Sequence, residues 1–344
     1  MMPAHRTRRG RPSSAGPRAL AIGLGALALS GAALGCGERP RGPQGSTLPA
    51  HPDAMTAMPA LPPVEEVSTK GGPAKPKVPA IEGSSPFPVP PFTDKPAKYV
   101  VEPGGKFSSL ADVAPILEPG DIVDVIGDTT YMGGVRFSKS GTPTQKIVIR
   151  GVPKNGKRPV LWGGPNTVEA AGNHYVFENL DITAGTRRCF FHHAHDITLR
   201  NSLVHGCPEQ GILGADTDSG SLTVEYCEVA RSGSGIYNHQ LYIATDETRY
   251  PKSVFRLQHS WVHDATGGNN VKSRAERNEI HYNWLESAQY HELELIGPDG
   301  QDPKLAREDG QIIGNVLYKA NDFHAVRIGG EGTGATDGSY RLVN

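Results

Sequence analysis

The sequence lacks an excess of charge of either sign. Its 344 residues carry 35 basic and 36 acidic side chains, which gives a formal net charge of −1 at pH 7. Beyond the N-terminus there is no basic run that would bind a phosphate backbone, and this argues against a nucleic-acid-binding protein. We therefore expect no nucleic-acid partner.

Cysteine is also scarce, with four residues in the whole chain. Cys36 ends an N-terminal segment, whereas Cys189, Cys207 and Cys227 lie in the body of the protein. In an exported protein two of these three can form a disulfide, which leaves at least one unpaired or paired elsewhere. Because the three fall at different places in the repeats described below, buried thiols are an equal alternative.

Recognised metal-binding motifs are missing as well. The histidine-rich segment 192–195 offers nitrogen donors but lacks the helical or cysteine-rich spacing of a zinc site. Acidic loop residues between positions 216 and 246 do not form a known calcium loop. The sequence therefore predicts no bound metal.

The N-terminal segment has the pattern of an export signal. Residues 1–18 contain five arginines and no acid, and residues 19–35 form the uncharged run ALAIGLGALALSGAALG. A run of 17 residues with this much glycine is marginal for a membrane-spanning helix. It ends in Ala33-Leu34-Gly35-Cys36, which resembles a bacterial lipobox with Ala33 in place of the usual leucine. The resemblance implies that residues 1–36 are a lipoprotein signal and that Cys36 is lipidated; plain secretion and a transmembrane anchor are the alternatives.

Residues 37–97 form a proline-rich segment that we interpret as a disordered linker. Such a composition cannot bury enough apolar surface to offset the entropy cost of ordering the chain. Its prolines favour an extended, semi-stiff tether. Attached to a lipidated cysteine, it would hold a folded domain, residues 98–344, away from a membrane. We expect an exported protein of the cell envelope, with a lipid anchor as its membrane contact, or an extracellular protein.

From about Tyr99 onward one short phrase returns, in which an apolar residue precedes a polar residue and then an asparagine or aromatic residue. Its copies begin at Phe177, Leu199, Val224, Leu257, Ile280, Ile313 and Leu342, with weaker copies at Val125 and Ile149. The intervals of 22 to 33 residues and the Gly-, Asn- and Asp-rich spacers without helical stretches are typical of a solenoid. A propeller needs longer four-stranded units, and a sandwich would not stack one phrase repeatedly. The pattern predicts an all-β, right-handed parallel β-helix of about nine rungs.

Three finer expectations follow from this repeat. Like residues of successive rungs would stack about 4.8 Å apart, so that Asn179 and Asn201 begin an internal asparagine ladder. Residues 108–121 resemble a short capping helix that runs into the first rung. The chain ends at Asn344 within a copy of the phrase, which we interpret as a truncated C-terminal end.

The opening of the repeat region carries a family resemblance. Pro119-Gly120-Asp121, followed by Gly127-Asp128-Thr129-Thr130-Tyr131, resembles the start of pectin-lyase-like β-helix proteins. The nearest motifs are those of the chondroitinase B and alginate lyase group of polysaccharide lyases. The likeness covers residues 99–344 as a pattern, with close matches only in short motifs. It implies a β-helix that acts on an acidic polysaccharide.

A second strand precedes each copy of the phrase. Because neighbouring side chains of a strand point to opposite faces, the middle residue of each strand is expected to face outward. Stacking the rungs then gives an outer column of Leu213, Tyr242, Lys272, Glu294 and Arg327. Expected beside this column are Gln240, Asn270 and Glu292, with Arg274 two places after Lys272 and with His239, His291 and His324 at the strand starts.

The outer column has a structural and a catalytic interpretation. Alternating charges on Lys272, Glu294 and Arg327 suit a surface ladder that sets strand register, whereas the gathering of histidine, tyrosine and glutamate favours a functional site. The resemblance implies that Lys272, in its Val-Lys-Ser context, is the base of an eliminative lyase. The arginine expected one rung later is missing, so Arg327 is the candidate replacement and Tyr242 the candidate acid. The family's Asn-Gly-Gly-Glu calcium motif is also absent before Lys272, with part of it at Gly329-Gly330-Glu331. We therefore expect no cofactor, with calcium as the open alternative.

Three functions remain open from the sequence. β-Elimination needs a base for the proton beside a uronate carboxylate, and positive charge to stabilise the enolate-like transition state. A glycoside hydrolase would use Glu292 and Glu294, about 6.5–7 Å apart at the backbone. A non-catalytic module would bind glycan through aromatic rings. The candidate substrate-binding residues are Asn270, Arg274, His239, His291 and His324.

Overall fold

The computed structural model describes residues 89, 92–297, 310–329 and 339–344. The predicted signal with Cys36, and the linker up to residue 88, lie outside the described residues. Within the described part no helix is long and apolar enough to cross a membrane.

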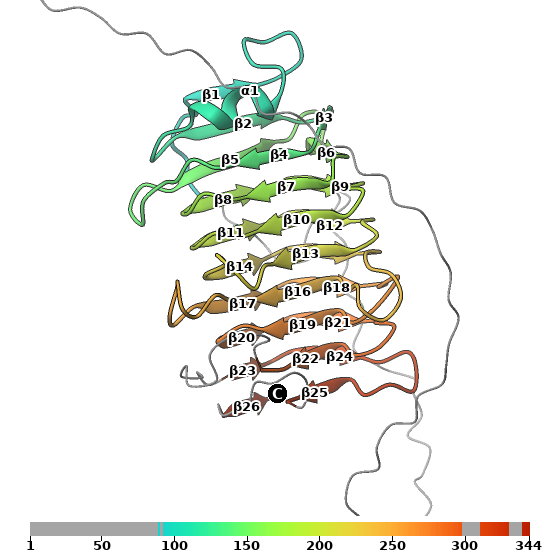
Figure 1. The fold of residues 1–344 in the computed structure, drawn as a ribbon. Helices are drawn as coiled ribbons and strands as arrows, with labels where there is room; N and C mark the ends of the chain where they lie inside the picture. Colours follow the sequence, from blue (N-terminus) through green and yellow to red (C-terminus); the bar gives the residue numbers. More distant parts are fainter. Residues whose placement is uncertain (1–88, 90–91, 298–309, 330–338) are drawn as a thin grey trace, which may run out of the picture. The chain divides into compact units, whose positions relative to one another are not determined.

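Short parallel strands build three sheets, which we name sheets A, B and C (Figure 1). Sheet A has ten strands: β1 (Tyr99–Val101), β2 (Ile122–Ile126), β5 (Ile147–Val152), β8 (Tyr175–Glu178), β11 (Ile197–Arg200), β14 (Leu222–Glu225), β17 (Val254–Gln258), β20 (Arg277–His281), β23 (Gly310–Ile313) and β26 (Tyr340–Val343). Sheet B has eight: β3 (Thr130–Met132), β6 (Val160–Trp162), β9 (Asp181–Thr183), β12 (Leu203–His205), β15 (Glu228–Ala230), β18 (Trp261–His263), β21 (Trp284–Glu286) and β24 (Val316–Tyr318). Sheet C also has eight: β4 (Val135–Phe137), β7 (Asn166–Ala170), β10 (Arg188–His192), β13 (Gln210–Gly214), β16 (Leu241–Ala244), β19 (Val271–Arg274), β22 (Leu293–Leu295) and β25 (Val326–Ile328).

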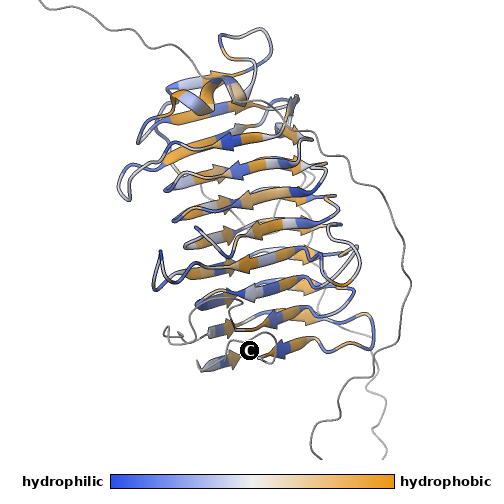
Figure 2. Ribbon diagram, in the orientation of Figure 1, coloured by the Kyte–Doolittle hydropathy of each residue, from blue (hydrophilic) through white to orange (hydrophobic). Residues whose placement is uncertain are grey.

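The chain visits sheets C, A and B in turn and then starts the next rung. Each strand therefore pairs in parallel with the equivalent strands of the rungs before and after it. The predicted all-β parallel β-helix of about nine rungs is confirmed. Figure 2 shows apolar colouring along the strands and polar colouring in many of the connections, as expected when alternate side chains fill the core.

Aromatic rings fill the core of the early rungs. The rings of Tyr175 and Phe177 stack 5.4 Å apart, and Phe137 and Phe190 each meet Phe177 edge-on at 5.2 Å. All four side chains are inaccessible to solvent. Because burying one such side chain stabilises a fold by about 1.5–3 kcal/mol, this cluster is a principal source of stability in these rungs.

The predicted capping helix is present as α1 (Leu110–Val113), followed by a 3-10 turn, η1 (Ala114–Ile116). Ser109 is its N-cap, and the Ser109 Oγ accepts a hydrogen bond from the Ala111 amide at 3.0 Å. The Ser109 amide in turn donates to Asp112 at 3.1 Å, which completes a capping box. Leu110 and Val113 are fully buried, so the helix covers apolar core at this end of the solenoid.

The structure corrects the register of two repeat copies. Ile280 pairs with Ile312 rather than with Ile313, and Ile149 pairs with Val123 rather than with Val125. The first shift has a clear cause. A residue with positive φ ends the sheet A strand in rung after rung, and Gly314 occupies that place with φ of 65°, so the paired apolar residue lies two positions earlier.

The asparagine ladder lies one position away from its predicted place. Asn201 does donate to Asn179 Oδ1 at 3.3 Å, but both have positive φ and lie partly exposed at the turn from sheet A to sheet B. The internal ladder joins Asn283 to Asn315, whose Oδ1 accepts from Asn283 Nδ2 at 2.9 Å. Both of these side chains are buried.

The cysteines resolve the alternative that the sequence left open. Cys189 and Cys207 form a disulfide, and Cys227 is a free, fully buried thiol. Burial raises the pKa of the Cys227 thiol to about 12, so it stays protonated at neutral pH.

Candidate functional site

The predicted outer column exists on the last five strands of sheet C. Tyr242 on β16 lies opposite Lys272 on β19, which lies opposite Glu294 on β22. Glu294 in turn lies opposite Arg327 on β25, and Leu213 precedes Tyr242 in the same register. Register therefore brings the five side chains into one line, as the alternation pattern predicts.

Glu294 is the centre of the charged part of this column. Its Oε1 accepts a hydrogen bond from Arg327 Nη1 at 2.7 Å, and its Oε2 lies 3.6 Å from Lys272 Nζ. The side-chain nitrogen of Asn269, Nδ2, also donates to Oε2 at 2.7 Å. Only 2% of Glu294 and 7% of Lys272 is exposed to solvent. Both residues are therefore much more buried than the surface ladder of charges that the sequence suggested. A buried carboxylate is tolerated here because two cations and an amide compensate its charge.

Tyr242 is held by an arginine. Arg274 Nε donates to the Tyr242 hydroxyl oxygen at 2.9 Å, and Arg274 Nη1 donates to the Gly297 carbonyl at 2.8 Å. The Lys272 ammonium lies over the Tyr242 ring, 5.5 Å from its centroid. Because a guanidinium can only donate, the phenol oxygen accepts from Arg274 and can still donate its own proton to a substrate. Negative charge that develops on this oxygen would be stabilised by both cations.

Asn269 was missed in the sequence, although it connects the parts of the site. Besides its bond to Glu294, its side-chain oxygen accepts from the His291 amide at 3.0 Å, and its own backbone amide donates to His239 Nδ1 at 2.9 Å. The His239 ring meets Tyr242 edge-on at 5.5 Å. Because Asn269 and Asn270 are adjacent and identical, the sequence alone does not show which of the two side chains points toward the charged column.

His291 and His324 lie beside the end of the column. His291 Nδ1 donates to the His324 carbonyl at 2.9 Å, and the two rings are 6.2 Å apart. Together with Asp322, Phe323 and Arg327 they line an open hollow of about 430 Å³. A ligand that binds along the outer column and extends beyond Arg327 would therefore contact these two histidines.

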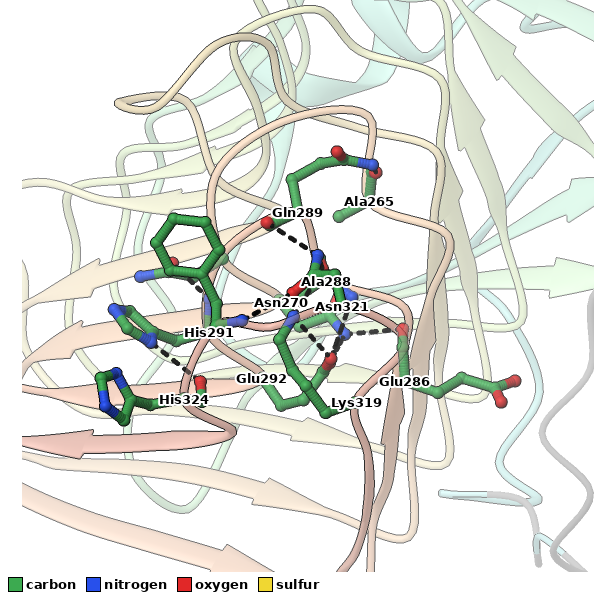
Figure 3. Close-up of polar contacts among 12 residues, drawn as sticks. Ala265, Asn270, Glu286, Ala288, Gln289, His291, Glu292, Lys319, Asn321 and His324 are labelled. Carbon is green, nitrogen blue, oxygen red and sulfur yellow. Dashed lines mark hydrogen bonds and ion pairs between the residues drawn. The ribbon is translucent and has the colours of Figure 1, made fainter. Parts of the chain in front are cut away.

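A second column, two residues before the first, turns out to be internal. Gln240 Nε2 donates to Asn270 Oδ1 at 2.9 Å, and Asn270 Nδ2 donates to the Glu286 carbonyl and to Glu292 (Figure 3). The three side chains have no exposed surface. The sequence places Asn270 and Glu292 beside the outer column, which is a wrong placement. They precede β19 and β22 rather than belonging to them, so strand alternation does not fix their direction.

Glu292 is bound within this inner column. It accepts a hydrogen bond from the Ala288 amide at 3.1 Å and lies 3.5 Å from Lys319 Nζ. Figure 3 shows Ala288 and Lys319 beside Glu292. Burial raises the pKa of the Glu292 carboxyl, and the Ala288 amide and Lys319 oppose that rise. The structure therefore separates Glu292 from Glu294 and gives the two carboxylates different surroundings.

The charge balance of the outer column favours an anionic ligand. On β16, β19, β22 and β25 the charged side chains are three cations, Lys272, Arg274 and Arg327, and one carboxylate, Glu294. Among the described residues no group of three or more His, Cys, Asp or Glu side chains is arranged to hold a metal ion. Gly330 and Glu331 of the partial calcium motif lie outside the described residues. The arrangement suits binding of a carboxylate next to a group that can move a proton.

Comparisons with known proteins give similarity of fold only. No protein-family model matches the chain, and no curated protein matches it in sequence. An alginate lyase from Paenibacillus sp. strain FPU-7 is 12% identical over 68% of this chain and 96% of that one, with a TM-score of 0.37. Pectate lyase Pel9A is 13% identical over 72% and 79%, with a TM-score of 0.41. A GH136 lacto-N-biosidase from Eubacterium ramulus is 12% identical over 71% and 66%, with a TM-score of 0.28.

Proposed function

We propose that the outer face of sheet C binds an acidic polysaccharide and cleaves it by β-elimination. The observation that carries this proposal is the placement of Tyr242. Its hydroxyl is hydrogen-bonded to Arg274 and its ring lies under Lys272, on strands with two more cations than carboxylates. A uronate presents a carboxylate next to the proton that elimination must remove, so it matches both features.

In this reaction a base takes the proton from the carbon next to the uronate carboxylate. The electron pair moves toward the carboxylate, then forms a carbon–carbon double bond as the glycosidic carbon–oxygen bond breaks, and the leaving oxygen takes up a proton. Positive charge near the carboxylate stabilises the enolate-like transition state, and a positioned acid–base group assists both proton transfers. No water is consumed, which distinguishes the products from those of hydrolysis.

We assign both proton transfers to Tyr242 and the stabilisation of charge to Lys272 and Arg327. As a phenolate, the Tyr242 oxygen takes the proton from the carbon, and as the resulting phenol it gives a proton to the leaving oxygen. The resemblance in sequence implies Lys272 as the base, but the Lys272 side chain is only 9% exposed and is 3.6 Å from Glu294. Tyr242 is the more accessible of the two. Arg327, with a side chain 42% exposed, can reach a bound polymer. Glu294 would then fix both cations in position.

The paired-carboxylate hydrolase has less support. It requires two carboxylates that face the same bound sugar. Glu294 lies in the outer column, whereas Glu292 has no exposed surface and is bonded to Asn270 and the Ala288 backbone. A water molecule and a sugar would both have to reach Glu292 through the inner column.

The deciding experiment incubates the purified protein with alginate, chondroitin sulfate, pectate and a neutral glucan. We expect one uronate polymer to give products with the ultraviolet absorbance of a double bond conjugated to a carboxylate. New reducing ends without that absorbance would show hydrolysis and contradict elimination. Binding without any product would show a non-catalytic glycan-binding module. No change in any polymer, in either assay, would overturn the proposal.

We also propose that the protein is exported and anchored through lipid on Cys36. The support is the basic segment, the uncharged run and the lipobox-like end of residues 1–36. Detergent phase partitioning of the expressed wild type and of the Cys36→Ala variant tests this. We expect the wild type in the detergent phase and the variant in the aqueous phase; wild type in the aqueous phase would contradict the anchor.

A further inference from the structure

A second hollow, of about 570 Å³, lies on the outer face of sheet B and is formed by different rungs from the Tyr242 column. Residues on β6, β9, β12 and β15 line it, together with residues around β3. Its charged side chains are Asp128, Lys157, Arg158, Asp181, Glu228 and Arg231. They amount to three acids and three bases, so the hollow has no net charge with histidine neutral.

Glu228 is only partly hydrogen-bonded. Its Oε1 lies 3.2 Å from His263 Nε2, but its Oε2 is buried and has no hydrogen-bond partner among the described residues. Only 7% of the residue is exposed. A buried carboxylate oxygen without a donor costs free energy, so such an oxygen at the wall of a hollow indicates a place for a donor on a ligand.

Asp181 provides a second acceptor across the hollow. Asp181 and Glu228 occupy the same register position on β9 and β15, with Leu203 of β12 between them. Two strand spacings separate their backbones by roughly 9.6 Å, and the Leu203 side chain between them forms an apolar floor over which a sugar ring can lie. His205, also in the lining, contacts Asp181 Oδ1 through its Nε2 at 3.0 Å. The two carboxylates can therefore accept from hydroxyl groups on opposite sides of a ring.

Trp162 gives this face an exposed aromatic surface. It lies on β6 two positions after Val160, which lines the hollow, so the two side chains share one face of the strand. Its exposed fraction is 49%. An indole ring offers a flat apolar surface on which the C–H face of a sugar can stack, next to groups that bind its hydroxyls.

We propose that this hollow is a second glycan-binding site and that its ligand is a neutral sugar unit. The group without a partner is a carboxylate oxygen, which would repel a uronate and needs a hydroxyl donor. A cationic ligand is disfavoured by Lys157, Arg158 and Arg231 in the same lining. A neutral glycan, with one ring stacked on Trp162 and the hydroxyls of a neighbouring ring donating to Glu228 and Asp181, meets all of these conditions. This site does not depend on the reaction assigned to the Tyr242 column.

The test measures binding of neutral hexasaccharides of glucose, mannose and N-acetylglucosamine, and of a hexauronate, to the full-length protein by calorimetry. We expect a neutral hexasaccharide to bind, and its affinity to fall about tenfold or more in Trp162→Ala and in Glu228→Gln. Gln at 228 keeps the shape but replaces one acceptor oxygen by a donor. Thermal unfolding of each variant checks that it folds.

Two control variants separate this site from its surroundings. Glu225→Gln lies on β14 of sheet A, where Glu225 pairs with Arg200 outside the hollow, and should leave binding unchanged. Lys272→Ala alters the Tyr242 column and should also leave it unchanged. The proposal is overturned if no neutral hexasaccharide binds, if folded Trp162→Ala and Glu228→Gln both bind as the wild type does, or if Lys272→Ala abolishes binding. Preferential, Trp162-dependent binding of the hexauronate would overturn the ligand class.

Discussion

Two columns of polar residues cross the same turns of the solenoid, two positions apart in sequence. One column is internal, and the other lies on the outer face. Gln240, Asn270 and Glu292 immediately precede sheet C strands and bond to one another and to the connections from sheet B. Tyr242 and Lys272, by contrast, lie within strands and face outward. A polar residue that precedes a strand in a β-helix can therefore be an internal connector, even when its neighbour two places later faces a ligand.

The outer face of sheet C and the hollow on sheet B also differ in net charge. The sheet C strands carry a surplus of two positive charges, and the hollow on sheet B is balanced. If both sites bind glycan, one protein molecule can bind an acidic polymer on sheet C and a neutral sugar unit on sheet B.

The largest effect is expected from removing one oxygen atom from the outer column. Tyr242→Phe should lower kcat for elimination by about 10²–10⁴-fold, because it removes the acid–base group. The free energy of unfolding should fall by only about 1 kcal/mol, the usual cost of one lost hydrogen bond. Steady-state kinetics on the uronate polymer and urea unfolding measure the two quantities.

Tyr290→Phe is the matched control for that variant. Tyr290 is also half-buried and packs against Phe323 at 4.7 Å, but it lies outside the outer column. Its hydroxyl should be dispensable for turnover. Equal losses of kcat in the two variants would show that removal of a tyrosine hydroxyl acts through the structure of this end of the solenoid. That result would contradict the acid–base role assigned to Tyr242.

The next effect is on stability, from the inner column. Asn270→Ala should lower the free energy of unfolding by about 1–3 kcal/mol, because Gln240 and Glu292 lose a buried partner. The kcat and KM of the remaining folded protein should stay near those of the wild type. Asn270 was predicted from sequence as a substrate-binding residue. A large rise in KM without loss of stability would restore that role and contradict the structural one.

A pH measurement tests the inner column in another way. Burial raises the pKa of Glu292 above its usual value of 4.5, so the folded state holds this proton more tightly than the unfolded state. Stability from Glu292 is therefore fully present below pH 4.5 and is lost as pH rises through the folded-state pKa. Glu292→Gln should show a smaller decline in Tm over that interval than the wild type. Identical pH profiles would mean that Glu292 does not titrate as an internal group.

The sequence predicted the fold and the outer column because both depend on alternation within strands. Tyr242, Lys272, Glu294 and Arg327 each sit between residues that face the core, and stacking of equal rungs then aligns them. Asn269 was missed because its position before β19 is not fixed by any period.

The sheet B hollow was missed for a related reason. Its residues come from positions 128–231 and belong to five strands and three connections, so no local motif unites them. Only the register, which places Asp181 and Glu228 two rungs apart on one face, brings them together. The disulfide was equally undetermined, since Cys189 and Cys207 occupy unlike positions in their rungs and only the folded geometry shows that they meet.

The smallest effect is expected at the opposite end of sheet C, beyond the outer column. Arg136 on β4 pairs with Glu169 on β7 in the same face of sheet C, but its side chain is 54% exposed. An exposed pair contributes about 0–1 kcal/mol to stability, so Arg136→Ala should change the free energy of unfolding by less than about 1 kcal/mol. Its kcat should equal that of the wild type, because Arg136 is several rungs from Tyr242. If instead Arg136→Ala raises KM for the uronate polymer with kcat unchanged, the polymer lies along the whole of sheet C, and the binding face extends from β25 back to β4.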